Sequence, residues 1–388
     1  FIEEISNGKY ELFFGDGSVG KQLEDGNIIF IEYIATNGEL ANKASSFTAT
    51  TAVGGVTSEN YILETATAAT GGANPQTNQS IKFQAPKLYS AQRRATTRED
   101  YKAIILEQRP DIESITVYGG EEADPIQYGK VFIAVKPTGN NTFSTASKNQ
   151  IKDTILSKVN VVTIQPELID PVFFYICTDT IVNYDPVKLL SDETTLKTNI
   201  DTSVQNYIQS NLEKFDQKFR YSQLVQDIDN TNNAIRNNKT SIKYQQRITP
   251  TNFSVAQTFT QYFLNELEKG SFASTSFTSA DGNTYSLIDD SLGFIKAART
   301  TNGVVDSPAV YLTQGDGTKN QGTIDYTTGK VVLNSLIIAT ISDETKSVRL
   351  NVTPEINNSD ITPLREQVLT YDVTDTDAIN ITMIAETI

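Results

Sequence analysis

The sequence contains no histidine and no tryptophan, and it has one cysteine and one methionine among 388 residues. The lack of histidine excludes a Ser-His-Asp triad and acid–base catalysis by imidazole. The single cysteine, Cys177, excludes an intrachain disulfide and a cysteine-based zinc site. Its apolar neighbours in VFFYICT predict a core thiol rather than a nucleophile. No stretch approaches the roughly 18 consecutive apolar residues of a membrane helix, so we expect no membrane contact.

Basic residues are also few. The chain has 32 Lys and Arg against 47 Asp and Glu, which gives a net charge of −15. Because nucleic-acid binding needs a basic surface that releases counterions, no nucleic-acid partner is expected. Hydrophobic residues make up 38% of the chain, which predicts thin cores spread over several modules. The length predicts two or three domains.

The first residues, FIEEISNGKY, include neither a signal peptide nor an initiator methionine. Because Phe1 opens in the middle of a strand-like pattern, we expect a fragment, a processed product or the ordered part of a longer chain. The preceding segment would then carry interfaces of its own.

Residues 1–85 predict a β-rich module, the C-terminal part of a truncated domain. Strands are predicted at Tyr10–Phe14 and Ile28–Ile34, then in the Thr-rich segment 45–53. Residues 54–80 indicate a surface excursion. The sequence GDGSVG at 15–20 matches the GxGxxG pattern of dinucleotide sites, but a strand is expected after it instead of a helix. We therefore interpret it as a glycine-rich turn and expect no cofactor.

Residues 86–250 predict an α+β layer with its helices on one face of a small sheet. Pro86 and Tyr89 are expected to end a loop, and Thr97 caps a helix that begins with Glu99 and Asp100. The expected order of the later elements is strand, strand, helix, strands, helix, helix, strand. Their predicted positions are 114–118, 130–136, a helix capped by Ser147, 161–164, 172–184, 196–212, a helix from 222, and 241–248.

Residues 251–388 predict a separate β-rich domain of short strands between turns, with the clearest strands at Val331–Ile341 and Ser347–Val352. TIDYTTGKVVL predicts a hairpin across Thr328-Gly329. The fold class is therefore α+β and multi-domain: a β-rich N-terminal module, a central sheet with helices on one face, and a C-terminal β domain.

Acidic residues suggest two further site types. The segments beginning at Asp227 and Asp372 resemble pieces of calcium loops but lack the glycine and glutamate of an EF-hand. Solvated turns are favoured, with a weak ion site in the second left open. The pairs Glu121/Glu122 and Asp289/Asp290 are adjacent in polar loops, unlike two acids that converge in a glycosidase cleft. We expect no catalytic residues, no metal site and no enzyme.

Arg93, Arg94 and Arg98 cluster just before the first predicted helix. They are the candidate subunit-interface residues, because arginine suits ion pairing at interfaces. Pairing with the chain's own carboxylates is the equal alternative.

Several motifs in a fixed order resemble the baseplate J-like family of contractile phage tails. They are Phe14-Gly15-Asp16-Gly17 with Gly26 and Tyr33…Gly38, then the segment Arg93–Tyr101, and then Val117–Gly119 with Val131–Pro137. The ordered set covers about residues 8–250. Within the family, the segments IEYIATNGELAN and YKAII…VFIAVKP look most similar to T4-type baseplate wedge subunits.

The resemblance implies a structural subunit of the virion tail baseplate, assembled in the host cytoplasm. It implies homo-oligomers, with copies paired within and between wedges in a sixfold ring around the hub, and contacts with other wedge subunits. It also implies transmission of the switch that triggers sheath contraction. Two alternatives remain from the residues: a β-rich receptor-binding or adhesin-type tail protein, and a tail-associated glycan hydrolase.

Overall fold

A computed structural model describes residues 2–6, 9–18, 20–32, 37–48, 68–69, 72–74, 76–92, 94–123, 125–161, 163–314, 317–342, 345–356 and 360–386. The chain divides into two compact units, Phe1–Gly38 and Glu39–Ile388. In the described part of the chain, no helix is long and apolar enough to cross a membrane.

The first unit contains an antiparallel hairpin of β1 (Ile2–Ser6) and β2 (Lys9–Leu12). The predicted strand Ile28–Ile34 is wrong over its described residues, 28–32, which form a loop because no neighbouring strand bonds to them there. The described residues of the GDGSVG segment lie in no helix or strand, and the Gly15 N–H donates to the Lys21 carbonyl at 3.1 Å. Gly17 has φ of 90°, a left-handed conformation that favours glycine.

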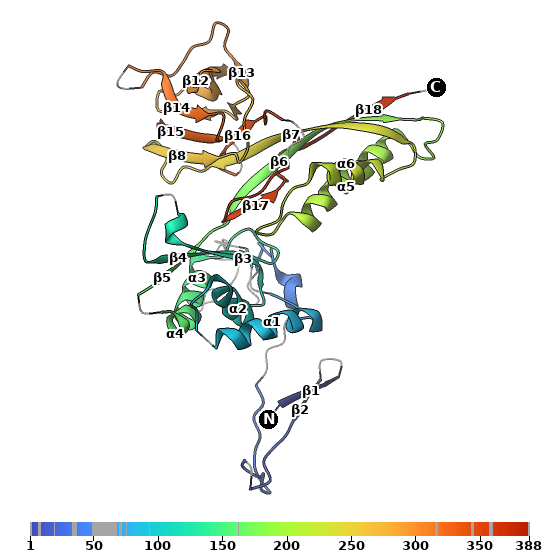
Figure 1. The fold of residues 1–388 in the computed structure, drawn as a ribbon, viewed down its shortest axis with the longest axis vertical. Coiled ribbons are helices and arrows are strands. Elements are labelled where there is room, and N and C mark those ends of the chain that lie inside the picture. The colour runs from blue at the N-terminus through green and yellow to red at the C-terminus, as the bar shows by residue number, and fades with distance from the viewer. Residues whose placement is uncertain are drawn as a thin grey trace. The chain divides into compact units, whose positions relative to one another are not determined.

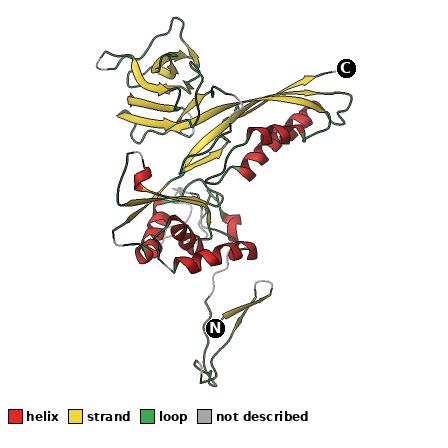
Figure 2. Cartoon of the chain, viewed as in Figure 1, coloured by secondary structure: helices red, strands yellow, loops and turns green. Residues whose placement is uncertain are grey.

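The second unit begins near the 3₁₀ turn η1 (Gly38–Ala41) and contains a small sheet in the order β3-β4-β5. Strands β3 and β4 are antiparallel, and β4 and β5 are parallel. Figures 1 and 2 show helices gathered on one face of this sheet. The elements are α1 (Asn78–Ala91), α2 (Arg98–Gln108), β3 (Ile112–Gly119), η3 (Gly120–Glu122), β4 (Lys130–Pro137), α3 (Thr145–Ile151), the π-helical turn η4 (Lys152–Leu156), α4 (Ser157–Val159) and β5 (Gln165–Ile169).

Local capping confirms one predicted helix start and corrects two others. Thr97 accepts a hydrogen bond from the Asp100 N–H and forms a full capping box, as predicted. The loop expected up to Pro86 is wrong, because α1 includes Pro86 and is capped by Thr77. The cap expected at Ser147 is Ser144, which accepts from the Ser147 N–H. The strand predicted at 161–164 forms later, as β5, where it bonds to β4.

The large sheet has the order β17-β6-β7-β16-β9-β11-β12-β14-β15-β8, with β18 also on β6, β10 on β11 and β13 on β12. Figure 1 shows α5 (Glu193–Asn211) and α6 (Tyr221–Asp229) along the ribbon of β6 and β7. The strands are β6 (Val172–Tyr184), β7 (Ile235–Ile248), β8 (Ala256–Tyr262), β9 (Ala273–Ser274), β10 (Phe277–Thr278), β11 (Thr284–Asp289), β12 (Phe294–Thr301), β13 (Val304–Val305), β14 (Asn320–Asp325), β15 (Lys330–Ile337), β16 (Val348–Val352), β17 (Gln367–Thr370) and β18 (Ile379–Ala385).

Strands on both sides of residue 250 share this sheet. β16 pairs antiparallel with β7, and β17 and β18 pair in parallel with β6. The predicted boundaries at 85/86 and 250/251 stay predictions. The predicted hairpin across Thr328-Gly329 is confirmed as β14 and β15.

Each sheet has its own hydrophobic core, and a third, small cluster joins them. Ala134, Phe215 and Val368 are buried together, with Ile169 and Phe173 packed against them. The Phe215 N–H also donates to Ser114 Oγ at 3.0 Å. We call the cluster of Ala134, Phe215 and Val368, with Ile169 and Phe173 packed against it, the apolar join. Two cores of different architecture confirm the predicted multi-domain α+β class.

Candidate assembly site at the join of the two sheets

A buried ion-paired cluster lies beside the apolar join. Asp372 is 1% exposed and forms ion pairs with Arg247 and with Arg349, whose Nε lies 2.9 Å from Asp372 Oδ2. The Thr374 N–H and hydroxyl donate to Asp372 Oδ1 at 2.9 and 2.7 Å. We call Arg247, Arg349, Asp372 and Thr374 the charged cluster.

Strand register explains why Asp372 is needed. Arg247 on β7 and Arg349 on β16 are directly opposite each other. Like charges at opposed positions repel, so a carboxylate between them stabilises the pair of strands. Asp372 comes from the loop after β17, and the cluster therefore fastens this loop to two strands of the large sheet. Arg247 also lies over the Tyr175 ring, 4.6 Å from its centroid.

The charged cluster holds Asp372 ionised. Burial acts to raise the pKa of Asp372, but hydrogen bonds from Arg247, Thr374 and Arg349 outweigh it and bring the pKa to about 2. At neutral pH this carboxylate cannot donate a proton as a general acid. Its chemistry is that of a fixed negative charge that binds cations of the same chain.

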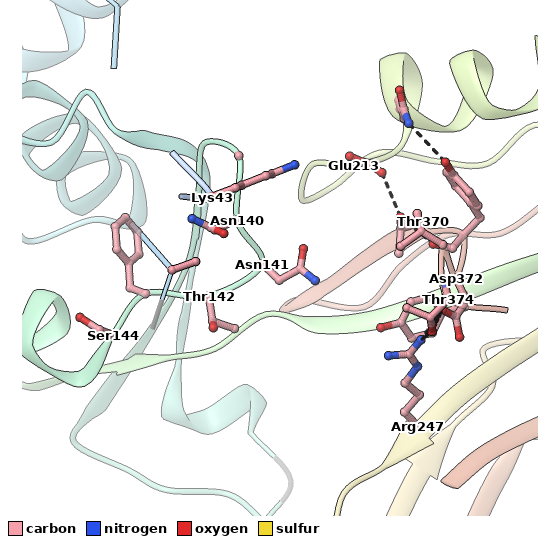
Figure 3. A pocket seen from close by; sticks show the side chains of 17 residues that line it. Lys43, Asn140, Asn141, Thr142, Ser144, Glu213, Arg247, Thr370, Asp372 and Thr374 are labelled. Atoms are coloured by element: carbon pink, nitrogen blue, oxygen red, sulfur yellow. Dashed lines mark hydrogen bonds and ion pairs between the residues drawn. The ribbon is translucent and has the colours of Figure 1, made fainter. Parts of the chain in front are cut away.

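A pocket of about 750 Å³ lies between the charged cluster and the loop 139–144 (Figure 3). On one side Figure 3 shows Asn140 and Thr142, and on the other Thr370 and Glu213. The Thr370 hydroxyl donates to Glu213 Oε1 at 3.0 Å. Both carboxylates of the pocket, Glu213 and Asp372, thus already accept hydrogen bonds from the chain. This arrangement suits a polar contact between parts of an assembly better than acid–base catalysis.

The structure places the two described arginines of the predicted interface, Arg94 and Arg98, in different environments. Arg98 forms an ion pair with Glu122, so it contacts a carboxylate of its own chain. Arg94 is exposed in the segment between α1 and α2. Arg93 lies outside the described residues. Of the two described arginines, Arg94 therefore presents the more available charge to a partner.

One of the two acidic segments differs from its predicted environment. The favoured solvated turn is wrong for Asp372, because Arg247 and Arg349 draw the side chain into the protein. Asp229 accepts from the Asn238 amide at 2.7 Å. In the described residues, no group of three or more His, Cys, Asp or Glu side chains is placed to hold a metal ion.

Cys177 is buried in β6, as predicted for a core thiol. Burial raises its pKa to about 12, helped by the charges of Asp375 and Asp372. The thiol is therefore protonated and unreactive at neutral pH.

Sequence reasoning missed the charged cluster. Its members lie on β7, on β16 and in the loop after β17, and nothing in their local sequences marks them as partners. The one available signal was the acidic segment at Asp372, which was interpreted without its arginines.

Comparisons with known protein families give two matches, and each match falls on a different sheet of the chain. Residues 97–169, which contain the small sheet, match the family "Baseplate structural protein gp6, C-terminal domain I". Residues 172–247, which contain β6, α5, α6 and β7, match "Baseplate structural protein gp6, C-terminal domain III". The predicted resemblance to T4-type baseplate wedge subunits is confirmed.

A longer relative agrees with the two domain matches. The chain is 24% identical over 357 residues to "Baseplate wedge protein gp6" of Enterobacteria phage T4, covering 84% of this chain and 53% of the relative. The chain thus spans about half the length of that relative. These similarities are to structural baseplate proteins, which supports the predicted structural, non-enzymatic role and the predicted location in a virion tail baseplate.

Proposed function

We propose that the protein is a structural subunit of a contractile-tail baseplate wedge. In this role it pairs with copies of itself, contributes to a sixfold ring around the central hub and contacts other wedge subunits. The observation that carries the proposal is that two gp6 domain matches, 97–169 and 172–247, fall on two separately cored sheets of the chain.

We also propose that the chain transmits the switch that triggers sheath contraction. In this proposal the two sheets move relative to each other at the apolar join. The apolar join has three buried residues, whereas each sheet has a larger core of its own. Small contacts between domains favour relative motion. A force on one sheet would then alter the apolar join and the pocket, while both cores and the charged cluster, whose members all lie on the large sheet or in the loop after its strand β17, stay intact.

A disulfide across the apolar join tests this transmission. Ala134→Cys and Val368→Cys replace two members of one buried cluster. We expect particles with this pair to assemble under oxidation, to fail to contract when triggered, and to contract after reduction. Each single substitution is the matched control. Normal contraction with a complete disulfide would place the switch outside this join.

We propose in addition that Arg93 and Arg94 contact another subunit of the baseplate. Arg94 is exposed and close to Arg93 in the chain, and an acidic partner surface would complement them. We expect Arg93→Glu with Arg94→Glu to impair assembly more than folding. Incorporation into purified baseplates measures the first, and denaturant unfolding measures the second.

A further inference from the structure

We propose that the loop segment 27–32 of one copy, which we call the arm, adds as a strand to the open edge of β18 in a second copy. The inference deepens the proposed wedge function, on which it rests, because it names one contact between paired copies. It follows from two features of the described structure that each call for a partner: the arm and the edge of β18.

The arm is an exposed run of four apolar residues in the sequence NIIFIE. Ile28 is 78% exposed, Phe30 91% and Ile31 64%. A continuous β-branched and aromatic run is typical of a strand that is buried on both faces. In the described structure no strand pairs with it. Leaving such a run in water costs roughly 25 cal/mol per Å² of apolar surface, so the sequence fits a strand that is completed by a partner.

β18 has one bonded side and one open side. The Thr178 N–H donates to the Ala378 carbonyl and the Glu386 N–H donates to the Tyr184 carbonyl, both at 2.9 Å. In a parallel ladder the residues that bond one neighbour alternate. The even-numbered residues of β18 therefore face β6. The backbone groups that point away from β6 belong to Ile379, Ile381, Met383 and Ala385, and in the described residues no strand pairs with them.

The neighbouring edge of the same ribbon is protected in a way that β18 is not. β16 covers β7 only over 244–248, and the stretch 235–243 carries Lys239 together with Arg236 and Lys243, which form ion pairs with Asp185 and Asp179 of the same chain. Cations on an edge strand oppose pairing with another chain. β18, with the sequence INITMIA, has no charged residue and no proline. The β7 edge thus carries charged side chains, whereas the β18 edge carries none.

A second copy of the chain is the occupant that these features favour. Each copy carries a net charge of −15, so most surfaces of two copies repel each other. The arm has one charged residue, Glu32 at its end, and β18 has none, which makes this contact one that avoids the repulsion. The lengths also agree, since six arm residues face a strand of seven.

A cysteine cross-link between copies tests the contact. A tagged Phe30→Cys chain is mixed with an untagged Thr382→Cys chain and oxidised at pH 8, where the buried Cys177 stays protonated because its pKa is raised to about 12. We expect a tagged–untagged cross-link that forms at least about tenfold faster than with Ile181→Cys, which is one strand further from the edge. Equal rates would overturn the proposal, as would a chain carrying both cysteines that cross-links only to itself.

Two matched lysine substitutions test the edge without cysteines. Ile384 on β18 and Ile181 on β6 are 43% and 40% exposed. Their positions in the parallel register place them on one face of the ribbon. We expect Ile384→Lys to weaken self-association by about tenfold or more and Ile181→Lys by less than about twofold, measured by sedimentation. Ala385→Pro, which removes an outward N–H, should act like Ile384→Lys.

The outcomes separate this inference from the wedge proposal. If none of these changes alters cross-linking or self-association while the chain still enters baseplates, the arm contact is wrong and the wedge function stands. If the unmodified chain is missing from baseplates, the wedge function is wrong whatever the arm does.

Discussion

The two gp6-like sheets differ in how they are covered. The small sheet has helices on one face and the apolar join on the other, so β3 and β4 are largely buried on both faces. The β6–β7 ribbon packs one face on α5 and α6 and presents residues such as Ile181 to solvent on the other. The small sheet is therefore built as a closed body, and the ribbon keeps an open face and an open edge. The comparison teaches that contacts made by adding a strand to a sheet are to be sought on the ribbon.

The largest effect on stability is expected in the core beneath the ribbon. Phe174 is fully buried, with its ring 5.2 Å from Tyr244 and 6.3 Å from Phe263. We expect Phe174→Ala to lower the free energy of unfolding by about 3–5 kcal/mol in urea titrations. The substitution removes a buried ring and leaves a cavity beside the rings of Tyr244 and Phe263. Phe30→Ala is the control and should change it by less than about 0.5 kcal/mol. Equal effects would mean that the arm is buried in the free chain.

The charged cluster should give the next largest effect. We expect Asp372→Asn to cost roughly 2–4 kcal/mol, because Arg247 and Arg349 then face each other without a carboxylate. The folded pKa of about 2 lies below the ordinary value of 3.8. The contribution of Asp372 is therefore present above pH 4 and is lost as the pH falls toward 2.

Thermal unfolding between pH 2 and pH 6 measures this dependence. The unmodified protein should unfold at a higher temperature than Asp372→Asn at pH 6, and this difference should shrink as the pH is lowered toward 2. A difference in unfolding temperature between the two proteins that stays constant down to pH 2 would show that the arginines do not stabilise the ionised form of Asp372.

A smaller effect is expected at the small sheet, where Thr97 caps α2. Thr97→Ala should cost about 1 kcal/mol, because the Asp100 N–H loses its acceptor. Thr198→Ala, an exposed site within α5, is the control and should stay within about 0.5 kcal/mol. A cost at Thr97 no larger than at Thr198 would mean that the capping box adds nothing measurable.

The smallest effect on stability is expected for Arg93→Glu with Arg94→Glu, below about 0.5 kcal/mol. The same double variant should nevertheless reduce incorporation into baseplates. Lys82→Glu with Lys152→Glu changes the net charge equally at exposed positions and is the matched control. Equal incorporation of the two double variants would count against the arginine interface.

How much the sequence predicts depends on the range of the interaction. The α2 cap and β6 were predicted closely, because a capping box and a long apolar run carry their signals within a few residues. The strand expected at Ile28–Ile34 failed over its described residues, since a strand also needs a neighbour. α1 was missed because Pro86 indicates a loop.

The candidate site was beyond local prediction for the same reason. Asp372 meets Arg247 across 125 residues of chain, and β18 lies beside β6 although they are about 200 residues apart. Such parallel pairing leaves no turn or spacing between the strands that marks the two as neighbours. The Arg93, Arg94 and Arg98 cluster was visible in the sequence, but its division into a self-paired Arg98 and an exposed Arg94 required the structure.

The most direct test of the account is an electron-microscopy reconstruction of the tail particle that contains this chain. We predict sixfold density for the chain in a ring around the hub, with the two gp6-like sheets resolved as separate bodies that share the apolar join. Density for the chain only at fibre tips would contradict the proposed wedge function.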